Sequence, residues 1–420
     1  MEIDAKLTNL VKKFYGKIDR SIGYPVCQYP NIAGFGEWYA KTGLCDFVVD
    51  NVGDPFDDEQ LLLNTTPIEK EVIETLAPFY DIPKGEEWGF ITNSGTDGNM
   101  HGIYFGAKKL QTETGMLPIV YISKEAHYSS ARICDVQNLE VRMIDYDGDG
   151  RMDLDCLKNS IDPTRPALIV IAFGSTFMGV IDDQDGIQRV LDEVKPVAYY
   201  KHLDAALFGG YLPFTEHKDL VSMSKHNYDS IAVSGHKFYG IDEPCGYFLA
   251  RKELIKSQKG FKVAYLNNDM PLISCSRSAL STLKFYWIIK NIGFEKLAEE
   301  ANAMLENTEY LQKKFDEIHY PAWHKPYSNT VFFKRPPEWM RQKYSLANGF
   351  IPQYGGELSH IVVMQHVKKE IIDEFIEDLL SPEPKPNETL SDEELKLVSG
   401  GDIGRIIEQA EEEAQKHSGD

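Results

Sequence analysis

Apolar runs of strand length alternate with helical periods from about residue 61 to residue 285, and this alternation limits the possible folds most strongly. Residues 167–172, for example, form an apolar run, and residues 185–194 follow it with the spacing of a helix. Strands that alternate with helices predict a mostly parallel sheet with helices on both faces. We therefore expect an α/β fold, in which ligands bind at the carboxyl ends of the strands.

The same pattern predicts four parts. Residues 1–60 suit an N-terminal arm that packs on a partner subunit, and residues 61–285 would form a large domain. Residues 286–380 would form a smaller α+β domain, because 329–333 and 360–364 have the composition of strands and 369–380 that of a helix. Residues 381–420 begin with a proline-rich linker and carry eleven acidic and four basic residues, a net charge of −7. We expect an acidic tail there.

Lys237 lies in a polar Ser-Gly-His-Lys corner between two apolar runs, 228–233 and 244–250. Ser234 and His236 bring hydrogen-bonding groups to the same corner. A lysine amine is normally protonated, but it attacks an aldehyde when its surroundings lower its pKa. Polar groups are costly to bury unless they bind something, so the corner predicts a binding site with a nucleophilic lysine. A surface lysine on a turn is the alternative interpretation.

Asp204 follows the apolar segment 196–200, so it is expected at the carboxyl end of a strand. An aspartate in that position can pair with a pyridine nitrogen and hold it protonated, which is what makes pyridoxal phosphate an electron sink. An aspartate that caps a helix is the alternative.

Two further strand ends carry suitable groups. Gly95 and Thr96 lie between an apolar strand at 88–91 and a helix at 100–107, where backbone amides and the helix N-terminus attract an anion such as phosphate. The loop has neither the G-x-x-x-x-G-K-[ST] nor the G-x-G-x-x-G pattern. His127 follows a strand at 119–122 and is placed to stack on a cofactor ring, although a core or capping histidine would have the same position.

Along the chain the four elements come in the order phosphate loop, histidine, aspartate and lysine, and in this order they resemble the group II pyridoxal-phosphate-dependent amino-acid decarboxylases. Within that family the chain is most similar to the branch of bacterial histidine decarboxylases and plant serine decarboxylases. The resemblance runs from about residue 22 to residue 380, and its motifs lie at residues 22–25, 51–56, 68–72, 92–99, 127–129, 174–183, 202–206, 234–237, 244–246, 276–277 and 359–364.

The resemblance implies a fold type I enzyme, similar to aspartate aminotransferase, that binds pyridoxal 5'-phosphate as a homodimer with the active site at the interface. Lys237 would bind the cofactor covalently, Asp204 would pair with its pyridine nitrogen, and His127 would stack on its ring. Thr176 would lie near the phenolic oxygen. Tyr265, on a mobile loop, would close over the substrate and help to protonate the product carbanion. The phosphate would be held by Gly95, Thr96, Ser234 and His236.

The reaction that the resemblance implies is removal of the α-carboxylate of an L-amino acid, with histidine as the leading substrate. Serine and aromatic amino acids are alternatives, because Arg277 is followed by Ser278-Ala279-Leu280 where the similar enzymes usually carry Asn-Gly-His. We expect this departure to lie near the cofactor. Two other classes stay open: a different fold type I enzyme, such as an aminotransferase or a cysteine desulfurase, and a non-catalytic relative that binds partners through its tail.

Composition indicates which kinds of partner the protein binds and in which cellular compartment it is expected. A formal net charge of −21 argues against nucleic acid. The six cysteines contain no C-x-x-C pair, which predicts reduced thiols and no metal site. The sequence contains no run of 18 apolar residues and begins without an apolar leader, so neither a membrane span nor secretion is predicted. We expect a cytoplasmic enzyme that acts on a small molecule.

Two motifs have less weight. Residues 145–150 begin like a calcium-binding loop, but Cys156 stands where the bidentate glutamate would be, so an acidic turn between strands is the better interpretation. In the tail, residues 390–401 resemble the double-glycine leader peptides of bacterial ribosomal natural products. The tail would then be recognised by another protein, and a solvated acidic tail is the alternative.

Overall fold

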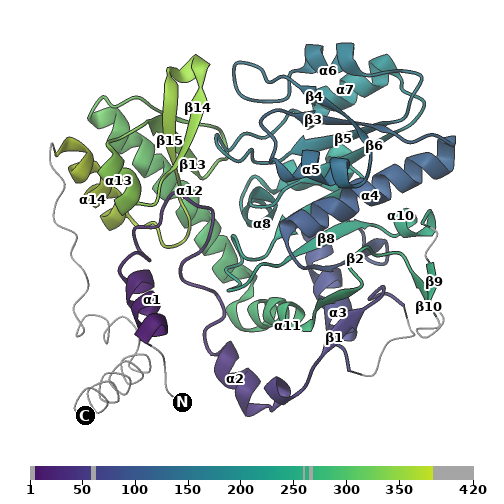
Figure 1. The fold of residues 1–420 in the computed structure, drawn as a ribbon, viewed down its shortest axis with the longest axis horizontal. Coiled ribbons are helices and arrows are strands. Elements are labelled where there is room, and N and C mark those ends of the chain that lie inside the picture. The colour runs from purple at the N-terminus through teal and green to yellow at the C-terminus, as the bar shows by residue number, and fades with distance from the viewer. Residues whose placement is uncertain (1–4, 58–62, 259–260, 264–267, 382–420) are drawn as a thin grey trace.

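A seven-stranded mixed sheet forms the centre of the molecule in the computed structural model, which describes residues 5–57, 63–258, 261–263 and 268–381 (Figure 1). Only β8 runs antiparallel to both of its neighbours, so the predicted mostly parallel sheet is confirmed. In spatial order the strands are β2 (Glu87–Thr92), β8 (Gly246–Arg251), β7 (Ser230–Ser234), β6 (Tyr199–Asp204), β5 (Ala167–Ala172), β3 (Ile119–Ser123) and β4 (Glu140–Ile144).

Helices cover both faces of this sheet, as the alternation of strands and helices predicted. Successive side chains of β5 enter different cores: Ile169 and Ile171 pack into one, Leu168 and Val170 into the other. The first core is covered by α3 (Thr66–Leu76), α7 (Gln184–Val194) and α12 (Gly293–Glu317), and the second by α4 (Gly95–Thr114) and α5 (Ser129–Val136). Shorter helices of this part are α6 (Leu154–Ser160), α8 (Phe208–Tyr211), α9 (Met223–His226) and α10 (Glu253–Lys256).

Helix α4 lies unusually close to the sheet because glycines face it. A Cβ atom on Gly98 would come within 2.8 Å of the Cβ of Ala232, and one on Gly102 would overlap the ring of His202. The close approach brings the N-terminus of α4 to the carboxyl ends of β6 and β7, where the predicted ligand site lies.

Strand β6 starts and ends later than the predicted strand at 196–200. The prediction missed its second half because Lys201 and His202 are polar, yet both are fully buried with hydrogen-bond partners. The Lys201 Nζ donates to Gln188 Oε1 at 2.6 Å and to the carbonyl of His226 at 2.8 Å. The longer strand makes Asp204 its last residue, which is the carboxyl end that the sequence predicted.

A second, four-stranded antiparallel sheet follows the first along the chain. Its strands, in spatial order, are β12 (Ala322–His324), β13 (Thr330–Lys334), β15 (Gly356–Val362) and β14 (Ala347–Ile351). It packs with α13 (Glu338–Lys343) and α14 (Lys369–Leu380), and the latter ends where the sequence predicted. The strand expected at 360–364 begins earlier, at Gly356. The division of the chain into four parts stays a prediction.

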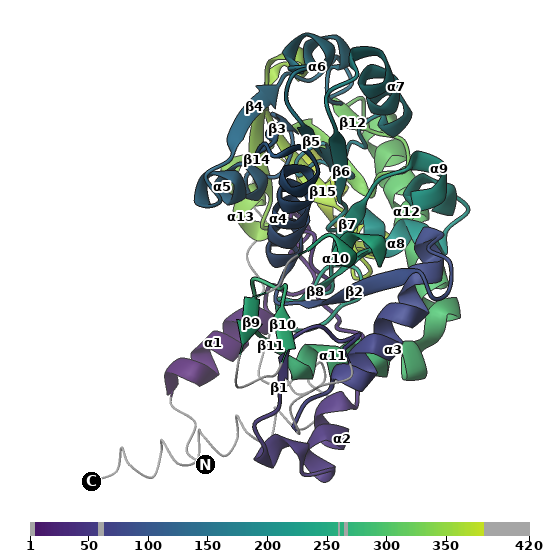
Figure 2. The same cartoon turned by 90° about the vertical axis from the view of Figure 1, so that its right-hand side faces the viewer.

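The N-terminal segments lie outside the two sheets. Figures 1 and 2 show α1 (Ala5–Tyr15) and α2 (Phe35–Lys41) projecting from the body of the molecule. Strand β1 (Asp50–Val52) pairs with β11 (Ser276–Ser278), which leads into α11 (Ala279–Trp287). Strands β9 (Phe261–Val263) and β10 (Asn268–Met270) pair with each other. Tyr265 and residues 382–420 lie outside the described residues, so the predictions for them are untested. Nowhere in the described chain is a helix both long enough and apolar enough to span a bilayer.

Candidate active site

One cavity of about 310 Å³ at the carboxyl ends of the parallel strands gathers nearly all the predicted site residues. It is lined by eight of the nine: Gly95, Thr96, His127, Thr176, Asp204, Ser234, His236 and Lys237. The ninth, Tyr265, lies outside the described residues. The lining comes from the loops after β2, β3, β5, β6 and β7, which are far apart in the sequence but end at the same edge of the sheet.

The N-terminus of α4 forms one wall of this cavity. The Oγ of Ser94 caps the helix by accepting from the amide of Asp97 at 3.1 Å. A Cβ atom on Gly95 would overlap the Oγ of Ser234, so only glycine lets the helix start this close to the end of β7. Free backbone amides and the helix dipole make such a helix N-terminus suited to a phosphate. The donor set therefore fits the phosphate of pyridoxal phosphate.

Asp204 is 8 % exposed, and in the described part of the chain its carboxylate accepts no hydrogen bond. The charges of Lys237 and Asp204 interact, but a buried carboxylate that accepts no hydrogen bond is costly. Asp204 can therefore accept a hydrogen bond from a ligand in the cavity, and the protonated ring nitrogen of pyridoxal phosphate is a suitable donor.

Lys237 follows β7 and is only partly exposed to the cavity. Burial lowers the pKa of its amine, and the negative charge of Asp204 opposes that effect. A lowered pKa increases the neutral, nucleophilic fraction of the amine, as a lysine that binds an aldehyde requires.

His127 is held in a fixed orientation at the cavity. Its Nδ1 lies 2.7 Å from the Oγ of Ser129 and accepts from the amide of Ser129 at 3.3 Å, which leaves the ring proton on Nε2. Burial lowers the pKa of His127; Asp204 raises it and Lys237 lowers it further. A neutral, oriented imidazole is suited to pack flat against a protonated pyridine ring, because it adds no second positive charge.

His236 and Thr176 differ in exposure. Burial also lowers the pKa of His236, whose Nδ1 lies 3.1 Å from the carbonyl of Cys245. Thr176 is exposed at the rim of the cavity, in the turn after β5.

Asn99 and His202 belong to the site but were not predicted. Asn99 lines the cavity, and its Oδ1 lies 3.0 Å from Nε2 of His202. The Nδ1 of His202 lies 2.8 Å from the Oγ of Ser230, and burial lowers the pKa of His202 to about 4. The signal was present in the sequence: residues 202 and 204 share one face of a strand, so His202 had to point to the same side as Asp204.

The segment after Arg277 contacts neighbours of the cavity lining: the amide of Ser278 lies 3.4 Å from Oδ1 of Asn93, and Ser281 donates to Glu243. Residues 276–281 do not line the cavity of the described chain. Arg277 is instead buried beside β2, with its Nη2 2.9 Å from Oε1 of Glu69 and its Nη1 donating to the carbonyl of Gly53. A guanidinium in a buried ion pair fixes the N-terminal segment against the sheet.

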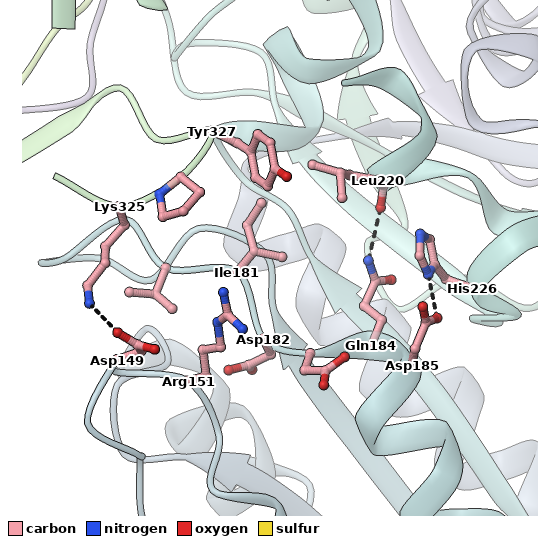
Figure 3. Close-up of a pocket in the computed structure, with 13 residues that line it drawn as sticks. Asp149, Arg151, Ile181, Asp182, Gln184, Asp185, Leu220, His226, Lys325 and Tyr327 are labelled. Carbon is pink, nitrogen blue, oxygen red and sulfur yellow. Dashed lines mark hydrogen bonds and ion pairs between the residues drawn. The ribbon is translucent and has the colours of Figure 1, made fainter. Parts of the chain in front are cut away.

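A second cavity of about 250 Å³ lies between the loop before α7 and the loop that leads to β13 (Figure 3). Its charged side chains are largely paired with each other: Lys325 with Asp149 at 3.0 Å and His226 with Asp185 at 2.9 Å. None of the predicted site residues lines it. Asp149 belongs to the calcium-like segment, which connects β4 to helix α6 and not to another strand. Among the described residues no group of three or more His, Cys, Asp or Glu side chains could hold a metal ion.

Comparison with known proteins identifies the family of this chain. The family described as "Pyridoxal-dependent decarboxylase conserved domain" matches residues 68–323. A histidine decarboxylase of Solanum lycopersicum is 30 % identical over 90 % of this chain and 89 % of its own length. A histidine decarboxylase of Vibrio anguillarum is 32 % identical over 84 % of this chain and 89 % of its own length.

Solved structures show the same fold. L-methionine decarboxylase of Streptomyces sp. 590 superimposes with a TM-score of 0.75 at 19 % identity, covering 90 % of this chain and 96 % of that one. The predicted fold type I is confirmed. The chain belongs to the pyridoxal-dependent decarboxylase family and is a pyridoxal-phosphate-dependent amino-acid decarboxylase. The predicted class of enzyme and its cofactor are thereby confirmed.

Proposed function

We propose that this enzyme removes the α-carboxylate of L-histidine and releases the amine and carbon dioxide. The observation that carries the proposal is the cavity that brings Lys237, Asp204 and His127 together at one sheet edge. Histidine leads as the substrate because relatives that match most of the chain are histidine decarboxylases. Serine and aromatic amino acids are the competing substrates.

Pyridoxal phosphate, when bound, supplies an electron sink for the charge left at Cα after carbon dioxide leaves. Asp204 keeps a proton on the ring nitrogen, because its buried carboxylate has no other donor in the described chain. Lys237 would hold the cofactor through Nζ, because its lowered pKa suits a nucleophilic amine. His127 packs on the ring, and Thr176 lies beside the phenolic oxygen. The phosphate is held by Gly95, Thr96, Ser234 and His236.

We assign the last proton transfer to Tyr265. Its phenol would donate a proton to Cα from the segment between β9 and β10, which would also close the site against water. Replacing Tyr265 by Phe removes the donor but keeps the ring. The expected result is a burst of at most one carbon dioxide per active site followed by slow release of amine and carbon dioxide at equal rates, which paired time-resolved assays of the two products measure.

We further propose that the enzyme is a homodimer in the cytoplasm. Ten of the nineteen exposed large apolar side chains of the described residues fall between Leu7 and Leu63, and four of these ten lie on the projecting helices α1 and α2. An apolar surface of this kind marks an interaction site. The six cysteines are all free thiols, which fits a reducing compartment.

The test combines an absorbance spectrum with an assay for carbon dioxide. Purified protein loaded with pyridoxal phosphate should show a visible band that Lys237→Ala abolishes and Lys334→Ala, at an exposed lysine on β13, leaves unchanged. Carbon dioxide should then be trapped with each of the twenty amino acids in turn. Release from histidine alone supports the proposal. Release of carbon dioxide from serine or an aromatic amino acid would make that amino acid the substrate in place of histidine. A cofactor band without release of carbon dioxide from any amino acid would contradict the proposed decarboxylation.

A further inference from the structure

The turn that follows β5, residues 174–180, is closed by its own hydrogen bonds. The amides of Gly174 and Ser175 both donate to the carbonyl of Val180, at 3.0 and 2.8 Å. The amide of Val180 donates in turn to the Oγ of Ser175 at 3.1 Å. Three of its residues, Gly174, Ser175 and Thr176, line the cavity. The turn therefore moves as a unit, and its position decides where one wall of the cavity lies.

This turn directly follows a strand of the central sheet, but its side chains pack against the second sheet. The ring of Phe177 stacks on the ring of His360 in β15, with centroids 4.7 Å apart and planes inclined by 21°. Phe177 also fills the space over Gly349 in the adjacent strand β14, where a Cβ atom would come within 2.7 Å of the ring. Gly179, at φ +65°, fits against Ser328 just before β13.

His360 holds the turn through the backbone as well as through its ring. Its Nδ1 lies 2.8 Å from the carbonyl oxygen of Phe177, and its Nε2 lies 3.1 Å from the carbonyl oxygen of Gly23 in the N-terminal segment. His360 is 4 % exposed, and burial lowers the pKa of its imidazole. A neutral imidazole donates from only one nitrogen. Both ring nitrogens face carbonyl oxygens, and these two contacts oppose the effect of burial on the pKa; the contact of Nδ1 is the shorter one.

We propose that His360 is a positioning residue, whose Nδ1–H holds the carbonyl of Phe177 and thereby sets the wall that Ser175 and Thr176 present to the substrate. The other parts of this wall are Thr330 and Val362, which pair with each other on the same two strands that carry Phe332 and His360. The second sheet would in this way control the fit of the amino acid. This inference rests on the proposed function, since it concerns the same cavity.

Among the described residues assigned to the cofactor, Thr176 alone lies in this turn, and the residues that anchor the phosphate and the aldehyde lie elsewhere. Gly95, Thr96, Ser234 and Lys237 follow β2 and β7, and none of them has a hydrogen bond to His360 in the described chain. Loss of the Nδ1–H contact should consequently raise KM for the amino acid and leave cofactor affinity unchanged. A residue needed only for folding would lower the amount of folded enzyme without changing KM.

Three substitutions of His360 distinguish the contribution of Nδ1 from that of Nε2. In His360→Asn the amide nitrogen can take the place of Nδ1, in His360→Gln it can take the place of Nε2, and His360→Phe keeps only the stacking ring. We expect KM to rise about tenfold in the Phe and Gln variants, the loss expected for one hydrogen bond to a backbone carbonyl. The Asn variant should stay within about twofold of the wild type, because it restores the bond that matters. Cofactor affinity, from titration of the visible band, should be unchanged in all three.

His366 supplies the matched control. It is also buried, and its Nε2 lies 3.0 Å from the carbonyl of Ser21 in the N-terminal segment, but it does not contact the turn. His366→Phe should therefore leave KM unchanged. Gly349→Ala tests the same wall without altering His360, because the new Cβ pushes on the Phe177 ring, and it should raise KM.

Several outcomes would overturn the inference. The first is a KM of the His360→Asn variant as high as that of His360→Phe, and the second is a KM of His360→Phe equal to that of the wild type. The third is a loss of cofactor affinity in proportion to the rise in KM. If His360→Phe fails to fold, Gly349→Ala and the comparison of Asn with Gln decide the question. A wild-type enzyme that ignores histidine would remove the proposed substrate but not this test, which is then run with the amino acid that the enzyme does decarboxylate.

Discussion

Asp204 is a buried carboxylate that the described chain leaves without a donor, and this makes the residue testable by itself. Replacing Asp204 by Asn keeps the size of the side chain but removes the charge that holds a proton on the ring nitrogen. We expect kcat to fall by about 100- to 1000-fold, as when one preorganised electrostatic group is removed from an active site. The Lys237-dependent absorbance band should remain. An Asn variant with nearly full kcat would contradict the role that we assign to Asp204.

The buried His202 predicts how the free energy of unfolding depends on pH. Its folded pKa is about 4 against an ordinary value of 6.5, because the ring is fully buried. Between pH 4 and 6.5 His202 binds a proton in the unfolded chain but stays neutral in the folded protein. Proton binding to the unfolded chain therefore lowers the free energy of unfolding as the pH falls from 6.5 towards 4, whereas above pH 6.5 there is no such loss. The loss amounts to at most about 3 kcal/mol.

Urea unfolding at several pH values measures this effect. His202→Gln loses the packing and hydrogen bonds of the imidazole, so the variant should be less stable than the wild type above pH 7. Glutamine does not titrate, so only the wild type loses stability on acidification, and the difference in the free energy of unfolding should narrow. A gap that stays constant with pH would show that His202 takes up its proton equally in both states.

At the scale of elements, the packing of α4 on the sheet depends on its glycines. A Cβ atom on Gly102 would overlap the ring of His202, which is fixed by Asn99 and Ser230 and has no room to turn. We expect Gly102→Ala to lower the free energy of unfolding by about 1–3 kcal/mol, the range found for overpacked cores. Gly148→Ala is the control, because nothing lies within 4 Å of the added atom. Equal unfolding midpoints for the two variants would show that α4 can move away from the sheet.

Most of the central sheet and of the cofactor site could be predicted from the sequence, because apolar runs such as 167–172 report burial directly. The second half of β6 could not, since Lys201 and His202 look exposed until their buried partners, thirteen or more residues away, are known. Helix α12 escaped prediction as well, although it is 25 residues long. The position of Arg277 depends on Glu69, a partner 208 residues distant, which no local pattern reveals.

At the scale of the whole molecule, the projecting N-terminal segments predict how the subunits associate. Val48 is 89 % exposed, next to the exposed Phe47. Placing a charge in a packed apolar interface is strongly unfavourable, so Val48→Glu should shift the protein from dimer to monomer. Sedimentation velocity at micromolar concentration measures the shift, and activity should fall with it if the partner completes the site.

The control for this experiment lies on another surface. Val136, at the end of α5, is 81 % exposed, and Val136→Glu should leave the protein dimeric. Dissociation by both variants, or by neither, would exclude the N-terminal segments as the specific interface.

The single antiparallel strand of the central sheet has a consequence for synthesis of the chain on the ribosome. Strand β2 is completely buried, yet its only neighbour in the sheet is β8, which pairs Arg251 with Glu87. Until β8 has been translated, β2 presents an apolar, unpaired edge, and such edges invite association with other chains. The cavity needs still more of the chain, because Thr330 and Val362 close it. A nascent chain that stops before β15 should therefore depend on chaperones and bind no substrate.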